Sequence, residues 1–453
     1  MRLKLQHLWA SLRSTYWFIP TIMAVAAGVA AVLLVRADRY LSAEHADRLG
    51  WIYAGGPEGA RAVLGVVAGS VMGTAGVTFS ITIAALSLAS TQLGPRLLYN
   101  FMRDRGNQFV LGTFIASFVY CLLILRTIRG AEEEGYFVPA MSVTAGVGLG
   151  LASLGVLIYF IHHVAVSIQA PNVVAAVGRD LARVVEVEFA TENAIPPGKT
   201  TPDLPDGFDE QAAEVPTTED GYVQALDEEA LVKIAARADL LLVVEQRPGH
   251  FVAEESPLVR AWPPGSLDDR LVREIRSHFV VGASRTPEQD VEFAVDQLVE
   301  VAVRALSPAI NDPFTAIGCL DWLGAALCRA GRGRTPDPVR KDAAGRVRVI
   351  HRCPISFAGL VDGAFNQIRQ FGARSPAVML RMLETIETVL RCTRGDPDEV
   401  AALLRHAEMI HRAGLDGAPE PRDRADIDDR YQDVLRAANR ISHRDTEAQR
   451  SRE

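Results

Sequence analysis

Lysine is scarce in this chain, and few lysines leave few candidates for Schiff-base or lysine-nucleophile chemistry. Of the 47 basic residues, four are lysines: Lys4, Lys199, Lys233 and Lys341. The five cysteines are scattered, with no C-x-x-C pair, which argues against a zinc site or a disulfide framework and suits a reducing compartment. The net charge of −8 argues against nucleic-acid binding, which a concentrated basic surface would indicate.

The signatures of common enzymes are also missing. The sequence contains no G-x-S-x-G motif, no Walker motif, no H-E-x-x-H motif and no EF-hand loop. Their absence disfavours an enzyme without excluding one. No feature of the sequence indicates a cofactor, and we expect none.

Charged side chains are absent from four long apolar runs, which cover residues 17–35, 62–90, 109–125 and 138–161. A hydrocarbon core of about 30 Å needs about 20 helical residues, so each run can form a membrane span. An even number of spans places both termini on one side, and the reduced-looking C-terminal half places that side in the cytoplasm. The fold class predicted is an α-helical integral membrane protein with four spans and a mainly α-helical cytoplasmic region that contains a small β module.

The second apolar run, 62–90, carries small and hydroxyl residues at intervals of four. On a helix, glycines at that spacing would form a bare groove, which lets another helix approach closely, with a hydroxyl stripe beside it. The candidate pore or helix-contact residues are Gly65, Gly69, Gly73, Ser70, Thr74, Thr78 and Thr82. A plainer alternative is that each hydroxyl bonds the backbone carbonyl one turn back, which requires no water.

This interpretation predicts which substitutions the second span tolerates. Leucine at Gly69 or Gly73 should disrupt close packing, because a large side chain would fill the groove. Leucine at Ala68 or Ala75 should be tolerated, since a helical wheel places both away from the two stripes.

The chain divides by composition into a transmembrane domain, 1–170, and a charged remainder. Residues 171–220 are expected to form a juxtamembrane helix and an acidic, proline-rich linker that cannot bury enough apolar surface to order itself. Residues 221–266 read as a small β module, 267–441 as a helical domain, and 442–453 as a disordered tail.

Several helices of the helical domain are predicted to begin at a proline that follows a capping residue. The pairs are Thr286-Pro287, Asp312-Pro313, Ser375-Pro376 and Asp396-Pro397. Proline at the first helical position gives up only an amide that has no partner within the helix, and the preceding side-chain oxygen can accept from another.

The helix predicted over 287–306 has one apolar face and two polar edges. Its acidic stripe consists of Glu288, Glu292, Asp296 and Glu300. Its other edge carries Asp290, Gln297 and Arg304 at intervals of seven. These edges could bind a ligand or a cation, but pairing with neighbouring helices and arginines is the favoured interpretation.

Particular segments in this region carry a family resemblance. They are 285–290, 304–308 and 311–313, together with 92–96 after the second span, and the candidate cytoplasmic motif is Arg285, Asp290, Gln297, Arg304, Asn311 and Asp312. These segments resemble the bacterial predicted-membrane-protein family catalogued as domain of unknown function 2254. The resemblance covers most of the chain. It implies a multi-pass protein of the bacterial inner membrane and no particular activity.

Three classes of function stay open. The first is an oligomeric channel- or transporter-like protein with a cytoplasmic regulatory domain, and the absence of charged residues inside the spans favours a passive pore over a proton-coupled pump. The alternative is a membrane-anchored assembly or signalling protein without transport activity. An enzyme acting at the membrane face is the third. The expected partners are the lipid bilayer and further copies of the chain, and no nucleic acid.

Overall fold

The computed structural model describes residues 17–40, 53, 55–94, 104–130, 136–190 and 204–450, the last nine of these by backbone alone. The chain divides into two compact units. We call His7–Gln169 the apolar unit. Ala170–Glu453, which we call the mixed unit, contains both helices and sheets.

The apolar unit is built from four long helices, and they confirm the four apolar runs as helical elements. They are α2 (Phe18–Tyr40), α4 (Pro57–Leu93), α6 (Arg105–Leu125) and α7 (Ala140–Ser167). Each is long and apolar enough to cross a membrane.

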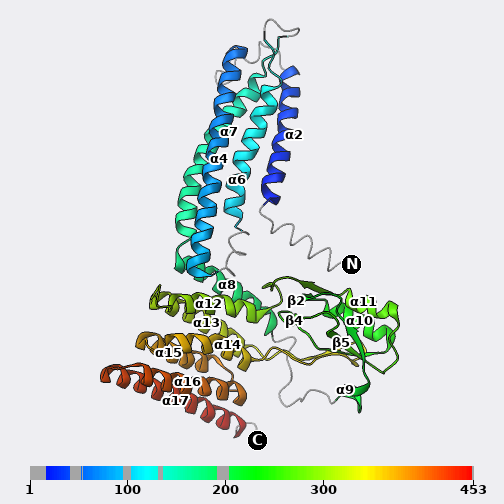
Figure 1. The fold of residues 1–453 in the computed structure, drawn as a ribbon, viewed down its shortest axis with the longest axis vertical. Coiled ribbons are helices and arrows are strands. Elements are labelled where there is room, and N and C mark those ends of the chain that lie inside the picture. The colour runs from blue at the N-terminus through cyan, green and yellow to red at the C-terminus, as the bar shows by residue number, and fades with distance from the viewer. Residues whose placement is uncertain are drawn as a thin grey trace. The chain divides into compact units, whose positions relative to one another are not determined.

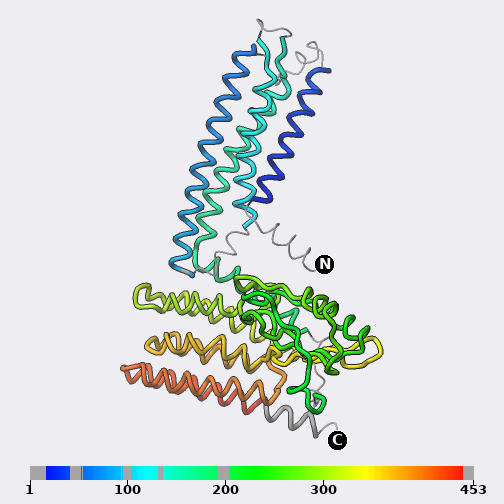
Figure 2. The backbone as a smooth tube through the Cα atoms, turned by 45° about the vertical axis from the view of Figure 1, so that its right-hand side comes forward, coloured from blue at the N-terminus to red at the C-terminus, as the bar shows by residue number. Residues whose placement is uncertain are grey.

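Helix α6 is the centre of the apolar unit, because α2, α4 and α7 all pack against it. Figure 2 shows the four helices running alongside one another. Tyr120, Cys121 and Ile124 of α6 are fully buried in this core. The start of α7 is held by Asp38 of α2, whose carboxylate accepts hydrogen bonds from the backbone amides of Met141 and Ser142 at 2.9 and 3.0 Å. A carboxylate at a helix N-terminus satisfies amides that have no partner within the helix.

The mixed unit contains ten helices within the part of the chain that the structure describes. They are α8 (Ala170–Glu188), α9 (Phe208–Gln211), α10 (Glu228–Ala238), α11 (Asp269–Arg276), α12 (Val291–Ala305), α13 (Pro313–Arg332), α14 (Phe357–Gly372), α15 (Pro376–Cys392), α16 (Pro397–Gly417) and α17 (Pro421–Arg450). The first of these, α8, confirms the amphipathic helix predicted after the last span.

The later helices form successive layers, which Figure 1 shows as a stack with the strands at one end. Helix α8 packs on α12 and α13, which pack in turn on α14 and α15, and these on α16 and α17. Each layer buries an apolar stripe against the next, as Phe365, Met382 and Ile410 do. The result is a continuous core that runs through the whole stack.

Two sheets make up the rest of the mixed unit. The five-stranded sheet has the order β1 (Ala213–Pro216), β5 (Pro257–Trp262), β3 (Leu241–Val244), β8 (Val347–His351), β7 (Val339–Lys341). The three-stranded sheet has the order β4 (Phe251–Val252), β2 (Gly221–Leu226), β6 (Phe279–Gly282). All pairings are antiparallel except β3 with β8. Val223, Leu242 and Val259 from both sheets share one core with Leu231 of α10.

The β structure is larger than the predicted module over 221–266. Strand β1 lies inside the predicted linker. It forms there because pairing with β5 fully buries Val215. Pro216 is tolerated because β1 is at the edge of the sheet. Residues 191–203 of that linker lie outside the described residues. Strands β6, β7 and β8 arise in the region predicted to be all helical, so that prediction is wrong for these segments. All three are short. Strands β6 and β8 form by pairing with the distant strands β2 and β3, and β7 forms a hairpin with β8.

Two helix boundaries also differ from expectation. Helix α12 begins at Val291 instead of Pro287, since the side chain of Asp290 caps it by accepting from the amide of Phe293. Helix α17 continues to Arg450, past the boundary expected at Ile441, so much of the predicted tail is helical.

Candidate functional site

The glycine face of α4 is uncovered within the described chain. A methyl group added at Gly65, Gly69 or Gly73 would meet no described atom within 4 Å. The opposite face packs into the bundle, where Ala68 and Ala75 are only 4% and 5% exposed. Leucine at either alanine would therefore enter a packed contact inside the chain, which contradicts the expectation that both positions tolerate it.

The hydroxyl stripe does not keep to one side of α4. Ser70 is exposed, Thr74 and Thr82 are half-buried, and Thr78 is 3% exposed inside the bundle. Residues four apart on an α-helix drift by about 40° at each step, so the stripe turns by roughly 120° from its first to its last member. Gly76 and Ser80, at shorter average spacing, stay on the glycine face and extend it.

The hydroxyls on α4 follow the plainer alternative where they bond within the helix. Thr74 Oγ1 donates to the carbonyl of Ser70, and Thr82 Oγ1 to that of Thr78, each at 2.9 Å. Ser80 Oγ donates to the carbonyl of Gly76 at 2.9 Å. Such a hydroxyl keeps its lone pairs free to accept from water or from a facing helix.

The candidate motif of the mixed unit centres on a fork between Arg285 and the buried carboxylate of Asp290. Nε and Nη2 of Arg285 donate to the two oxygens of Asp290 at 2.7 and 2.8 Å, and Nη1 donates to Asp296 at 2.8 Å. Asp290 is 1% exposed and Arg285 lies over the ring of Phe293. Gly249, at φ +97°, comes so close to Asp290 that a side chain there would collide with the carboxylate. The fork thus ties the segment before α12 to the start of that helix, and Gly249 leaves room for the carboxylate.

Arginines pair with the acidic stripe of α12, as the favoured interpretation predicted. Glu292 bonds Arg247 at 2.6 Å and Glu300 bonds Arg304 one turn later at 3.2 Å. On the other edge Gln297 is 2% exposed, so it lies in the core of the unit.

Asn311 and Asp312 shape the turn between α12 and α13. Asn311 adopts the left-handed conformation at φ +51°, which asparagine tolerates better than most residues. Asp312 caps α13 by accepting from the amide of Thr315 at 3.1 Å and from its hydroxyl at 2.6 Å. Both residues therefore have structural roles.

A polar cavity of about 550 Å³ lies in the mixed unit between α8, the start of α10 and the segments on either side of the β7–β8 hairpin. Glu228 stands in its wall, where Arg340 Nε and His351 Nε2 approach its oxygens at 2.7 and 3.1 Å. Burial alone would raise the pKa of Glu228, but the hydrogen bonds and charges of His351 and Arg340 outweigh it and lower that pKa to about 2.

Two further groups are incompletely paired in this polar cavity. Burial raises the pKa of Glu188, and the negative charge of Glu228 adds to the rise. Arg247 donates to Glu292 through Nη2, while its Nε and Nη1 are buried and have no hydrogen-bond partner among the described residues. A large cavity with convergent charges and perturbed carboxyl groups is the usual form of a small-ligand site.

Sequence reasoning did not find this polar cavity. Its charged and titratable residues include ones from α8, α10, β7, β8 and the segment between β3 and β4, which lie more than a hundred residues apart at their extremes. No local spacing links Glu188, Glu228 and His351, so the sequence carries no signal that joins them.

Similarity searches place the chain in a family. The family model described as "Predicted membrane protein (DUF2254)" matches residues 13–388. Uncharacterized proteins of Mycobacterium tuberculosis and Mycobacterium bovis are each 32% identical over 421 residues, which cover 91% of this chain and 79% of each relative. No solved structure matches the chain. The resemblance carried by the segments around Arg285 and Asn311 is thereby confirmed: the chain belongs to the DUF2254 family of predicted membrane proteins.

Proposed function

We propose that this protein is an oligomeric, channel-like protein of the bacterial inner membrane, in which the glycine face of α4 borders a path shared between copies. The observation that carries the proposal is the absence of cover over Gly65, Gly69 and Gly73 among the described residues, while the opposite face of α4 is packed. The face continues through Gly76 and Ser80, so a row of small and hydroxyl residues runs between exposed apolar ones such as Val66 and Met72.

The glycine face of α4 can meet lipid, another helix or water. A lipid-facing helix gains nothing from glycine or serine, whereas small residues let helices pack closely and hydroxyls can bond across the contact or to water. Contact between copies or an aqueous path therefore accounts for this face of α4, and lipid does not. Copies arranged around the α4 faces would provide both the contact between copies and the aqueous path.

The mixed unit has a regulatory role in this proposal. The polar cavity around Glu188 and Glu228 supports binding of a small polar ligand, because its groups have charges that the protein itself leaves incompletely paired. All five cysteines are free thiols, which suits the cytoplasmic side. Both termini are then cytoplasmic.

A second candidate function is a membrane-anchored assembly or signalling protein without transport. The observation in its favour is that Thr74, Thr82 and Ser80 donate to carbonyls of their own helix. A hydroxyl satisfied in this way needs no water, so copies could meet in a dry contact.

Single cysteines in a background without the five native ones separate the two candidates. The test positions are Gly73, Gly76 and Ser80, with Thr78 as the buried control and Ile158 of α7 as the exposed apolar control. A path predicts modification of the three test positions by a charged thiol reagent, together with a change in ion flux through reconstituted protein. Disulfides between copies without modification or flux would support the assembly function. If no test position shows modification with flux, or disulfides between copies, both candidate functions are overturned.

A further inference from the structure

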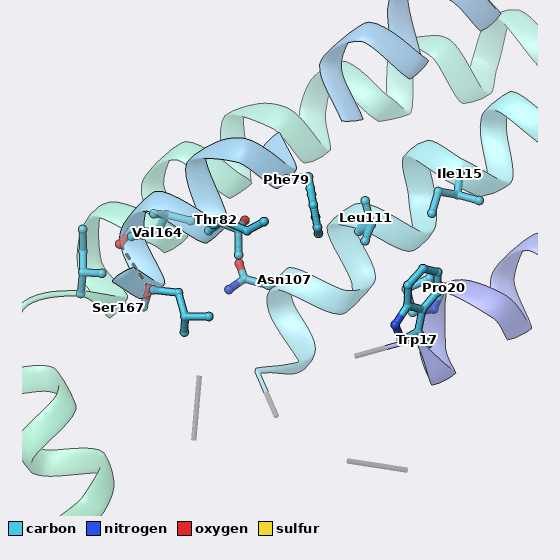
Figure 3. A pocket seen from close by; sticks show the side chains of 13 residues that line it. Trp17, Pro20, Phe79, Thr82, Asn107, Leu111, Ile115, Val164 and Ser167 are labelled. Carbon is cyan, nitrogen blue, oxygen red and sulfur yellow. Dashed lines mark hydrogen bonds between the residues drawn. The ribbon is translucent and has the colours of Figure 1, made fainter. Parts of the chain in front are cut away.

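The apolar unit contains a second cavity, of about 290 Å³, that belongs to neither of the sites above. All four helices line it, and Figure 3 shows Phe79 of α4 facing Leu111 of α6, with Pro20 of α2 and Trp17, just before α2, lying together below Leu111 and Ile115 in this view. The lining is almost wholly apolar, and the described lining residues include no charged side chain. We call this space the apolar cavity.

One polar side chain points into this apolar setting without a partner. Asn107, in the first turn of α6, is 7% exposed, and its Oδ1 has no hydrogen-bond partner among the described residues. Figure 3 shows its amide between α6 and α4, on the side of Thr82, whose own hydroxyl hydrogen is donated to Thr78. A buried amide group left unpaired is destabilising, so a ligand that bonds it would be stabilised there.

The shape of the apolar cavity specifies the occupant. From Asn107 to Ile115 it follows two turns of α6, which is roughly 12 Å at 1.5 Å per residue and close to the depth of one leaflet of a 30 Å hydrocarbon core. Its polar end lies at the start of α6, just inside the cap at Asp104, where a span would leave the membrane. Its rim is open to the surroundings of the bundle, since Trp17 is 74% exposed and Ile83 is 50% exposed.

We propose that the apolar cavity holds one acyl chain of a glycerolipid, with the amide of Asn107 bonding the ester region of that lipid. The hydrocarbon contacts Phe79, Leu111 and Ile115, and the amide, whose oxygen and nitrogen exchange places by a flip, donates to the ester carbonyl. The absence of charge in the lining predicts no selection between headgroups. Because the acyl chain lies between α2 and α4, it supports the position of α4.

This inference rests on the proposed membrane placement but not on a path along α4. The test uses the full chain in nanodiscs that contain phosphatidylcholine and phosphatidylglycerol, with a diazirine in the middle of one acyl chain of either lipid. After illumination, mass spectrometry maps the labelled peptides. We expect labels on residues 79–86 and 107–115 with both lipids, because the middle of an acyl chain held in the cavity would lie beside them.

Filling the cavity should remove that label. Leu111→Trp, or Ile115→Trp as a second variant, should lower labelling of these peptides roughly tenfold, the effect of displacing two buried methylene groups. Asn107→Leu should lower it about fivefold through the lost hydrogen bond. Ile158→Trp is the matched control on an exposed apolar surface of α7, and it should leave the label unchanged. Elution as a sharp peak identifies the variants that fold.

Two results would overturn the inference. One is labelling spread evenly over all exposed apolar helix surfaces and unaffected by either filling variant. The other is the absence of label from residues 79–86 and 107–115 while other exposed apolar helix surfaces are labelled, which would mean that something other than lipid fills the cavity. Neither readout uses flux or contact between α4 faces, so the inference and the proposed function fail separately.

Discussion

Glu399 is a buried carboxyl group in the first turn of α16, 8% exposed, whose Oε2 has no hydrogen-bond partner among the described residues. Burial raises its pKa to about 7, with a further contribution from the negative charge of Asp396. A carboxyl group with a raised pKa in the folded state stabilises the fold below its unfolded pKa, and this contribution is lost as the pH rises through the folded pKa.

We therefore predict that the stability of Glu399→Gln relative to the wild type is higher at pH 8 than at pH 5. The unfolded pKa is 4.5 and the folded one about 7, so the variant should gain roughly 3 kcal/mol over the wild type across that interval. Thermal unfolding at the two pH values measures it. Glu408→Gln, on the exposed side of the same helix, is the control and should show no such change. Parallel pH profiles for Glu399→Gln and the wild type would contradict the prediction.

The fork between Arg285 and Asp290 predicts a second effect at this scale. Arg285→Ala leaves the carboxylate of Asp290, 1% exposed, without its main partner, which should lower the free energy of unfolding by about 3–5 kcal/mol. The matched control is Arg183→Ala, which removes an exposed partner of Asp180 and should cost less than about 1 kcal/mol. Denaturant unfolding compares them. Equal small losses would mean that the fork contributes no more than a surface ion pair.

At the scale of one element, α4 has two faces that should respond oppositely to the same substitution. Ala68→Leu adds bulk to a packed contact and should destabilise the apolar unit by about 1–3 kcal/mol. Gly69→Leu meets no described atom of its own chain and should leave that stability unchanged while weakening contact between copies. Thermal unfolding and native mass spectrometry separate the two effects. Destabilisation by Gly69→Leu and tolerance of Ala68→Leu would restore the assignment made from the helical wheel.

At the scale of the whole molecule, four apolar helices predict that both termini lie on the same side of the membrane. Reporter fusions ahead of α2 and after the C-terminus should agree with each other and differ from a fusion placed within 41–52. We expect the two terminal fusions to report the cytoplasm. A periplasmic C-terminus would contradict both the topology and the proposed placement of the mixed unit.

Much of the helical architecture was predictable because its signals are local. Charge-free runs marked the four apolar helices, and Asp312-Pro313 and Asp396-Pro397 marked two helix starts whose aspartates do cap. The same signal failed at Thr286-Pro287, because the buried Asp290, four residues beyond Thr286, caps α12 instead. A capping motif is thus overruled where an ion pair, here with Arg285, holds a better cap in place.

The sequence by itself determined the helices, their apolar or amphipathic character and the family, since each follows from residues close together in the chain. The tertiary structure decided which face of α4 is covered, because apolar residues are spread around the whole helix and no single stripe marks its packed side. It also decided the parallel pairing of Val243 with Ile350 and the two cavities. Each of these joins residues far apart in sequence, whose proximity arises only when the packed elements bring them together.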